Sequence, residues 1–136
     1  MKRLRRLQLV AHGEPSDVIE LSTVSQPALG QEDVLVSMEA APLNPSDFLL
    51  VGGIYGVRPA FPFSLGSEGV GRVTQTGSKV DTALQGKRVL ILPTYEQGTW
   101  GDQVVVPVRN VVPVSDKADA LQLAMIGINP ATAYLL

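Results

Sequence analysis

Short apolar runs alternate with turn-forming residues along the whole chain of 136 residues. The runs are rich in valine, isoleucine and leucine, and thirteen glycines and ten prolines separate them. This punctuation is typical of a β domain with many turns, so we predict a mainly β fold. The predicted strands cover residues 6–11, 18–25, 33–42, 68–77, 87–93, 101–108 and 111–114.

The stretch 33–42 shows the clearest alternation among these strands. Apolar positions 34, 36 and 38 alternate with positions 35, 37 and 39, of which the last two are polar, so one face should be buried and the other wetter. Pro107 and Pro113 would each remove a hydrogen bond from a central strand. We therefore expect both prolines at a sheet edge or at a strand end.

A short stretch after Pro45 breaks the strand pattern. Residues 46–53 have the length of a single helical turn before a pair of glycines, and Ser46 or Asp47 can cap that turn. We predict a short helix here.

Two more helices are expected near the carboxyl end. Residues 115–127 carry apolar side chains at helical spacing, with Ser115 or Asp116 as the cap. Asn129 then suits the cap of a last helix that ends on apolar residues. Since an apolar end usually docks onto other protein, we expect a longer parent protein; a complete small β domain with a frayed end is the alternative.

Composition excludes several classes of function. The 11 basic and 13 acidic side chains give a formal net charge of −2, without the basic footprint of a nucleic-acid-binding protein. The absence of cysteine excludes disulfides, thiolate zinc sites, iron–sulfur clusters and a cysteine nucleophile. With His12 as the only imidazole, we expect no metal site.

Nothing in the chain predicts a membrane or targeting role. The basic amino end, residues 1–13, lacks the long apolar segment and the small-residue cleavage site of a targeting peptide. The apolar runs fall far short of the roughly 20 residues that span a bilayer. We expect a soluble, cytoplasmic protein without nucleic-acid or membrane partners.

The glycine-rich stretch 65–71 does not match a dinucleotide-binding loop. Such a loop leads from a strand into a helix that binds the phosphates, whereas strand-like sequence follows this one. We expect these glycines at a bulge or a close backbone approach. Glu68 among them is predicted to be a buried, paired structural carboxylate, with a catalytic carboxylate as the alternative.

Two aromatic residues are candidates for a site. A phenol titrates near pH 10, so Tyr55 is a neutral O–H donor at neutral pH that can stabilise a developing negative charge; burial of its ring for packing is the alternative. Trp100 is the only tryptophan and lies in a glycine-flanked stretch before a strand. It suits either the core or the wall of an apolar ligand pocket.

Five stretches together resemble the catalytic half of the medium-chain dehydrogenase/reductase superfamily, in order and in spacing. Within it the chain looks most like the zinc-free 2-enoyl thioester reductases of the mitochondrial type, with quinone oxidoreductases as near neighbours. The stretches are "APLNPSDFLLVGGIYG", "FPFSLGSEGVGRVTQTGSKV", "GKRVL", "GTWGDQVVVP" and "INPATAYLL".

The resemblance implies a fold and a set of partners. It implies a GroES-like, partly open β-barrel with short helices over residues 1–115, and a helical segment over residues 116–136 that leads toward a Rossmann domain absent from this chain. NADPH and a small-molecule or acyl-thioester substrate would bind in the cleft between the two domains. The parent protein would be a homodimer.

The resemblance also assigns roles to single residues. Tyr55 matches the proton donor of the enoyl reductases, and Trp100 matches a tryptophan near the substrate cleft. Asn129 matches an asparagine that contacts the nicotinamide cofactor, with Thr132 as its neighbour. Asn44 joins this cofactor-binding set and stands where zinc-dependent relatives have a cysteine ligand, so no metal would polarise the substrate carbonyl.

The expected function is therefore the NADPH-dependent, zinc-independent reduction of activated C=C bonds, most of all those of 2-enoyl thioesters. The 136-residue chain alone is expected to be inactive. Two alternatives stay open: a quinone or enone oxidoreductase of the same superfamily, and a stand-alone GroES-like module without enzymatic activity.

Overall fold

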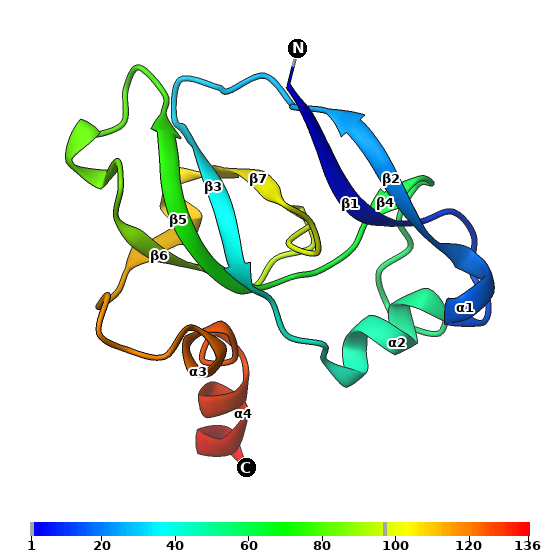
Figure 1. Ribbon diagram of the computed structural model, residues 1–136. Helices are drawn as coiled ribbons and strands as arrows, with labels where there is room; N and C mark the ends of the chain where they lie inside the picture. Colours follow the sequence, from blue (N-terminus) through cyan, green and yellow to red (C-terminus); the bar gives the residue numbers. More distant parts are fainter. Residues whose placement is uncertain (1, 97) are drawn as a thin grey trace.

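The computed structural model describes residues 2–96 and 98–136 and confirms a mainly β fold with short helices (Figure 1). Its strands form two antiparallel sheets that are not closed into a barrel. The three-stranded sheet has the order β2 (Ile19–Ser25), β1 (Arg3–Leu9), β4 (Phe63–Ser64). The five-stranded sheet has the order β7 (Gln103–Pro107), β3 (Asp33–Ala40), β5 (Gly69–Thr76), β6 (Arg88–Ile91), β8 (Val111–Pro113).

All seven predicted strands are present, and two details differ from the prediction. β1 begins at Arg3, three residues earlier than expected, because the basic residues at its start pair in register with β2, from Arg3 opposite Ser25 to Leu9 opposite Ile19. β4 was not predicted, since a strand of two residues leaves no apolar run to detect. It pairs with the end of β1.

The two strand prolines lie where the sequence predicts. Pro107 ends β7 and Pro113 ends β8, and these strands form the two edges of the five-stranded sheet. A proline at an edge leaves the inner ladder of backbone hydrogen bonds intact.

The main core lies on one face of the five-stranded sheet and consists largely of valines. Positions 34 and 36 belong to it, as the alternation predicts, but Leu35 on the opposite face is also fully buried. A register shift between Leu35 and Val36 interrupts the pairing of β3 with β5 at this point, whereas Glu39, further along the strand, is exposed as predicted. The core members are Val34, Val36, Val73, Val80, Val89, Ile91, Val104, Val106 and Val111.

Helix α2 (Pro45–Val51) occupies the predicted position, but its capping residue is Asn44 and not Ser46. The Asn44 backbone N–H donates to Oδ2 of Asp47 at 2.7 Å, which satisfies an amide that the helix itself leaves free. The short helix α1 (Pro15–Val18) and the two 3₁₀ turns, Thr82–Leu84 and Val108–Asn110, were not predicted because each covers only about one turn.

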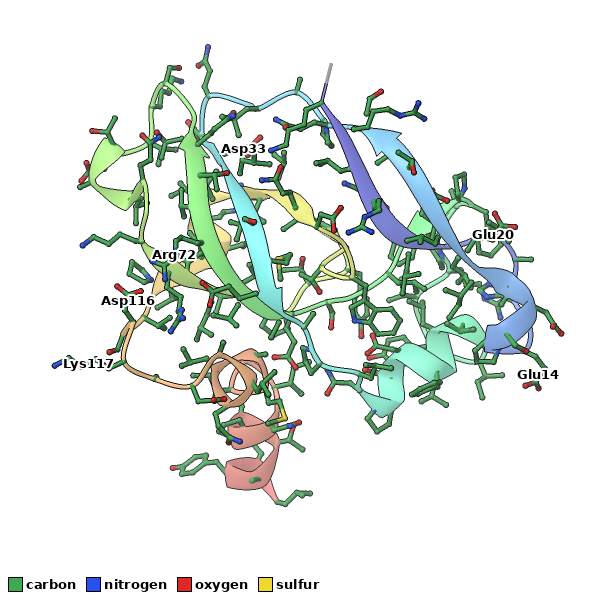
Figure 2. All side chains as sticks on the ribbon, viewed as in Figure 1. Glu14, Glu20, Asp33, Arg72, Asp116 and Lys117 are labelled. Carbon is green, nitrogen blue, oxygen red and sulfur yellow. The ribbon has the colours of Figure 1, made fainter. Side chains whose placement is uncertain are left out.

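Helix α3 (Ala120–Ala124) starts later than predicted. Its cap is Asp119, whose carboxylate accepts from the Gln122 N–H at 3.0 Å. The predicted cap Asp116 lies in the preceding loop and pairs with Arg72 at 2.9 Å, on the outer side of the five-stranded sheet (Figure 2). Ser115 lies in the same loop, outside the helix.

Helix α4 (Asn129–Leu135) is present, with Asn129 as its first residue and Ile128 at the cap position. α3 packs on β5 through Leu123 and Ala124 against Val70. α4 instead projects away from both sheets (Figure 1), and Tyr134 near its end is 90% exposed. Within residues 2–96 and 98–136, no helix has the length and apolarity needed to cross a membrane.

The glycines of the 65–71 stretch mark close backbone approaches, as predicted. At Gly71, in the middle of β5, an added Cβ would overlap the carbonyl group of Ser37 on the neighbouring strand β3. At Gly66, φ is +94°, and a Cβ would meet Thr99 and Trp100. Only glycine allows both the backbone conformation and the contact at this position.

Replacing Gly71 by alanine is expected to lower the free energy of unfolding by about 1–3 kcal/mol, because the added methyl group meets backbone that cannot move aside. Urea unfolding measures the change. Gly56→Ala is the matched control: no atom lies within 4 Å of its added Cβ, so its stability should stay within about 0.5 kcal/mol of wild type. Equal stability of the two variants would contradict the close approach of β3 and β5.

Candidate active site

Tyr55 lies in the bend that follows α2, and its hydroxyl forms a hydrogen bond with that of Tyr95, in the loop after β6. Tyr95 Oη donates to Tyr55 Oη at 2.6 Å, and the ring centroids are 5.6 Å apart. Both half-buried rings pack against an apolar cluster that includes Leu50 and Leu65. The ring of Tyr55 therefore contributes to packing while its hydroxyl stays in a polar pair.

Tyr95 holds its proton more strongly than an ordinary phenol. Burial is the main cause that raises the pKa of Tyr95, from 10.0 to about 12, and the hydrogen bond and charge interaction with Tyr55 add to it. The carboxylate of Asp47 acts in the same direction, while the hydroxyl of Ser46 acts against it. At neutral pH Tyr95 is therefore a neutral donor.

A buried polar cluster lies behind α2. Asn44, Asp47 and Glu68 are 6%, 2% and 1% exposed. Asn44 Nδ2 donates to Oε1 of Glu68 at 2.9 Å, and the Asn44 backbone N–H donates to Asp47. The prediction of Glu68 as a buried, paired carboxylate agrees with this geometry.

Burial raises the pKa of both carboxyl groups in the cluster. For Glu68, burial is the largest cause, the Asn44 hydrogen bond and the amides of Ile128 and Gly127 oppose it, and the charge of Asp47 reinforces it. For Asp47, burial again dominates, and the Asn44 amide opposes it.

The second carboxylate oxygen of Glu68 faces the segment just before α4. An added Cβ at Gly127 would lie against Oε2 of Glu68, so glycine permits the close approach. Oε2 accepts no hydrogen bond of ordinary geometry within the described residues, although the neighbouring amides lower the pKa of Glu68. One carboxylate thus connects the start of α2 with the start of α4.

The predicted cofactor residues differ in their surroundings. Asn129 is exposed at the start of α4. Thr132 is also exposed, and its hydroxyl donates to the Ile128 carbonyl of its own helix at 3.0 Å. Asn44 is buried, and its amide N–H group is engaged by Glu68. Among the described residues, no hydrogen bond joins any of the three to Tyr55.

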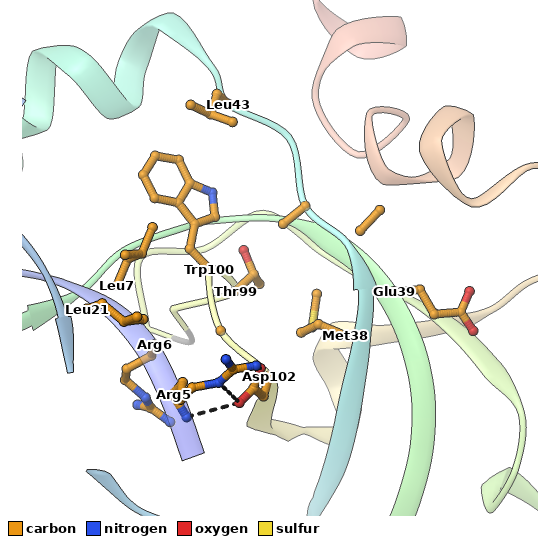
Figure 3. A pocket seen from close by; sticks show the side chains of 13 residues that line it. Arg5, Arg6, Leu7, Leu21, Met38, Glu39, Leu43, Thr99, Trp100 and Asp102 are labelled. Atoms are coloured by element: carbon orange, nitrogen blue, oxygen red, sulfur yellow. Dashed lines mark hydrogen bonds and ion pairs between the residues drawn. The ribbon is translucent and has the colours of Figure 1, made fainter. Parts of the chain in front are cut away.

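Trp100 lies both in the core and at a groove. Its indole N–H donates to the Pro42 carbonyl at 3.0 Å, and its ring packs against the same apolar cluster as Tyr55. It also lines an open groove of about 520 Å³ between the two sheets (Figure 3). Tyr55 does not line this groove, whose large apolar members are Leu7, Leu21, Met38, Leu43 and Trp100.

The backbone of Trp100 joins the two sheets. The Leu7 N–H of β1 donates to the Trp100 carbonyl at 2.8 Å, and the Trp100 N–H donates to the Leu65 carbonyl at 3.0 Å. At the mouth of the groove, Asp102 pairs with Arg5 of β1 at 3.1 Å (Figure 3). Within residues 2–96 and 98–136, no three His, Asp or Glu side chains gather as they would around a metal ion.

Sequence reasoning missed Tyr95, because nothing in its local sequence indicates a partner. The contact arises only when the loop after β6 returns to the bend after α2. The sequence also gave no sign that the Asn44 amide would be bound by Glu68, 24 residues away.

A match to a known protein family defines the class to which this chain belongs. Residues 30–116 match the alcohol dehydrogenase GroES-like domain, and the chain belongs to that family. The match begins just before the third predicted strand and includes Asn44, Tyr55, Tyr95 and Trp100.

Particular relatives narrow the similarity to reductases. The chain is 38% identical over 132 residues to the mitochondrial enoyl-[acyl-carrier-protein] reductase of Bos taurus, covering 97% of the chain and 35% of that protein. A putative NADPH:quinone reductase from Bacillus thuringiensis has a similar structure, with a TM-score of 0.91 and 36% identity, over 99% of this chain and 40% of that one. Etr1p in complex with NADP and crotonyl-CoA matches with a TM-score of 0.87 and 25% identity, over 99% and 43%.

The chain therefore spans about 35–43% of the length of these relatives. The superfamily and the GroES-like fold expected from the sequence are confirmed.

Replacing Asn44 by aspartate is expected to place a second carboxylate 2.9 Å from Glu68 in a buried site. We expect a loss of about 3–5 kcal/mol in the free energy of unfolding near neutral pH, because the buried charges become uncompensated. The loss should shrink as the pH falls from neutral toward about 4, because the buried pair takes up a shared proton above the ordinary carboxyl pKa of about 4.

Urea unfolding at both pH values measures this effect. Asn129→Asp makes the same chemical change at an exposed position and should alter the stability by less than about 0.5 kcal/mol. A pH-independent loss in Asn44→Asp would argue against carboxylate repulsion.

The raised pKa of Tyr95 predicts a loss of stability in alkali. The unfolded chain releases the Tyr95 proton near pH 10, whereas the folded chain keeps it to about pH 12. The folded state thus binds more protons between these values, so the stability contribution is present below about pH 10 and is lost as the pH rises toward 12.

Urea unfolding at several pH values from about 9 to 11.5 tests this prediction. The free energy of unfolding should fall more steeply for wild type than for Tyr95→Phe. Tyr134→Phe, at a 90% exposed tyrosine, should follow wild type. Identical slopes for wild type and Tyr95→Phe would refute the raised pKa.

Proposed function

We propose that this chain forms the catalytic part of an NADPH-dependent, zinc-independent oxidoreductase that reduces the C=C bond of 2-enoyl thioesters. The observation that carries the proposal is the hydroxyl of Tyr55, held at the apolar edge of the fold by a second phenol at 2.6 Å. The similarity to enoyl-[acyl-carrier-protein] reductases supports the choice of substrate class.

The three predicted cofactor residues offer some of the hydrogen-bonding groups that a nicotinamide carboxamide needs. Asn129 has an exposed amide that can both donate and accept hydrogen bonds, as a carboxamide ligand requires. Thr132 donates within its own helix, so its oxygen is left as an acceptor. Asn44 has its N–H group on Glu68, so a contact from Asn44 would use its carbonyl oxygen.

NADPH, when bound, supplies a hydride for the β-carbon of the enoyl group. The negative charge that follows is shared between the thioester oxygen and the α-carbon, and Tyr55 is the O–H donor that stabilises this charge and protonates the α-carbon. One such donor lowers a barrier by about 2.7–4 kcal/mol, roughly a hundred- to a thousandfold in rate. Because phenol is uncharged at neutral pH, it needs no metal to perform this role.

Trp100 is proposed to line the substrate pocket. Its ring contacts the apolar cluster of Tyr55 on one side and the groove on the other. An apolar wall of this kind suits an acyl chain, whose transfer from water is favourable.

A quinone oxidoreductase is the second candidate. Its support is the similarity to the putative NADPH:quinone reductase from Bacillus thuringiensis. Quinone reduction would depend less on Tyr55, so the two candidates differ in their response to the loss of its hydroxyl.

Tyr55→Phe in the full-length protein that carries this chain is expected to lower kcat for crotonyl thioester about 100- to 1,000-fold. The assay follows the loss of NADPH absorbance as the cofactor is oxidised. Ser78→Ala removes a hydroxyl from an exposed turn after β5 and should leave kcat unchanged. Thioester turnover that survives Tyr55→Phe would reject the donor role, and quinone turnover that survives it would favour the second candidate.

Three further features stay predictions. We propose that the Rossmann domain lies outside this chain, so that the 136 residues alone are inactive, and that the full-length protein is a homodimer. Location in the cytoplasm is also part of the proposal, whereas the names of the enoyl reductase relatives describe those proteins as mitochondrial. A stand-alone module without activity would show no NADPH oxidation in any full-length form.

A further inference from the structure

Within the described part of the chain, the hydroxyl of Tyr95 forms a hydrogen bond with one phenol, that of Tyr55, which is the proposed donor. The 2.6 Å distance from Tyr95 Oη to Tyr55 Oη is at the short end for two hydroxyl groups. The rings are tilted by 57° and are not stacked, so the hydroxyl contact and not ring stacking fixes their relation. A hydroxyl has a single proton, so in any one state only one of the two phenols donates to the other.

The surroundings favour Tyr95 as the donor of the pair. Tyr95 lies close enough to Asp47 for that carboxylate to disfavour a negative charge on its ring, and burial acts in the same direction. If Tyr95 keeps its proton and donates it to Tyr55 Oη, the proton of Tyr55 is free to point to another acceptor.

The loop that carries Tyr95 is anchored to the buried cluster. The Thr94 N–H donates to the Ser67 carbonyl at 3.0 Å, next to Glu68, and the Glu96 N–H donates to the Thr94 hydroxyl at 3.2 Å. Tyr95 therefore stands between two backbone-bound residues. This support restricts where its hydroxyl can lie.

We propose that Tyr95 is a positioning residue for the reduction: it donates its hydroxyl proton to Tyr55 Oη, directs the Tyr55 proton toward the substrate, and stabilises the Tyr55 phenolate that remains. This inference rests on the proposed function of Tyr55. During the step, the O–H bond of Tyr55 breaks and a C–H bond forms at the α-carbon of the enolate. The phenolate regains a proton from solvent water after product release.

A phenolate accepts a stronger hydrogen bond than a neutral phenol does, because charge-assisted bonds are roughly twice as strong. The contribution of Tyr95 therefore grows as the proton leaves Tyr55, and it appears in kcat more than in KM.

Tyr95→Phe in the full-length protein is expected to lower kcat for crotonyl thioester about 10- to 100-fold, with KM changed less than about twofold. The solvent deuterium isotope effect on kcat should increase, because proton transfer becomes more limiting. Ser78→Ala, in an exposed turn after β5, is the control and should keep the wild-type values. Urea unfolding at neutral pH verifies that each variant is folded.

A double-mutant cycle separates positioning from a structural role. In the Tyr55→Phe background, Tyr95→Phe should change kcat less than about twofold, because the group through which it acts is already gone. An equal loss in both backgrounds would mean that Tyr95 only supports the fold and would overturn the proposal. Wild-type kcat in Tyr95→Phe would overturn it as well.

Failure of the proposed function gives a different result. If wild type does not reduce the thioester, or if Tyr55→Phe alone keeps full turnover, the donor role of Tyr55 is rejected and the role of Tyr95 falls with it. An impaired Tyr55→Phe beside an unimpaired Tyr95→Phe rejects only the positioning role.

Discussion

The carboxylate of Glu68 is the constraint on which the arrangement of this chain depends. It is almost completely buried, and a buried charge strongly destabilises a fold unless polar groups surround it. The groups that surround it come from distant segments: the Asn44 amide from the start of α2, and the amides of Gly127 and Ile128 before α4. Thr99 donates to the Glu68 backbone carbonyl at 2.7 Å and adds the segment of Trp100. The side chain and the backbone carbonyl of this one residue thus bring four parts of the sequence together.

Tyr55 and Tyr95 each lie on a segment that is bonded to this buried cluster. Tyr55 follows α2, whose first turn is held by Asn44 and Asp47, and the loop of Tyr95 is bonded to Ser67 beside Glu68. The phenols therefore meet because the two segments that carry them are each bonded to neighbouring parts of this cluster.

The sequence could predict the strands because alternation and prolines are local signals, and Pro107 and Pro113 lie at the sheet edges as expected. It could not predict β4, whose two residues gain their place only by pairing with β1. The partners of Asn44 and Tyr55 were equally out of reach, since they lie 24 and 40 residues away. For Trp100 the sequence left two alternatives, the core and the wall of a pocket. Its ring contributes to both.

The carboxyl groups belong to this buried cluster, whereas the proposed reacting groups are phenols. The carboxyl groups of Asp47 and Glu68 are buried, whereas the phenol rings of Tyr55 and Tyr95 are half-buried. A negative carboxylate nearby disfavours a second negative charge, which is one reason why the pKa of Tyr95 is raised and Tyr95 stays protonated. A protonated Tyr95 can donate to Tyr55 but cannot take its proton at neutral pH. The buried carboxylate of Asp47 therefore favours the direction of the hydroxyl bond, from Tyr95 to Tyr55.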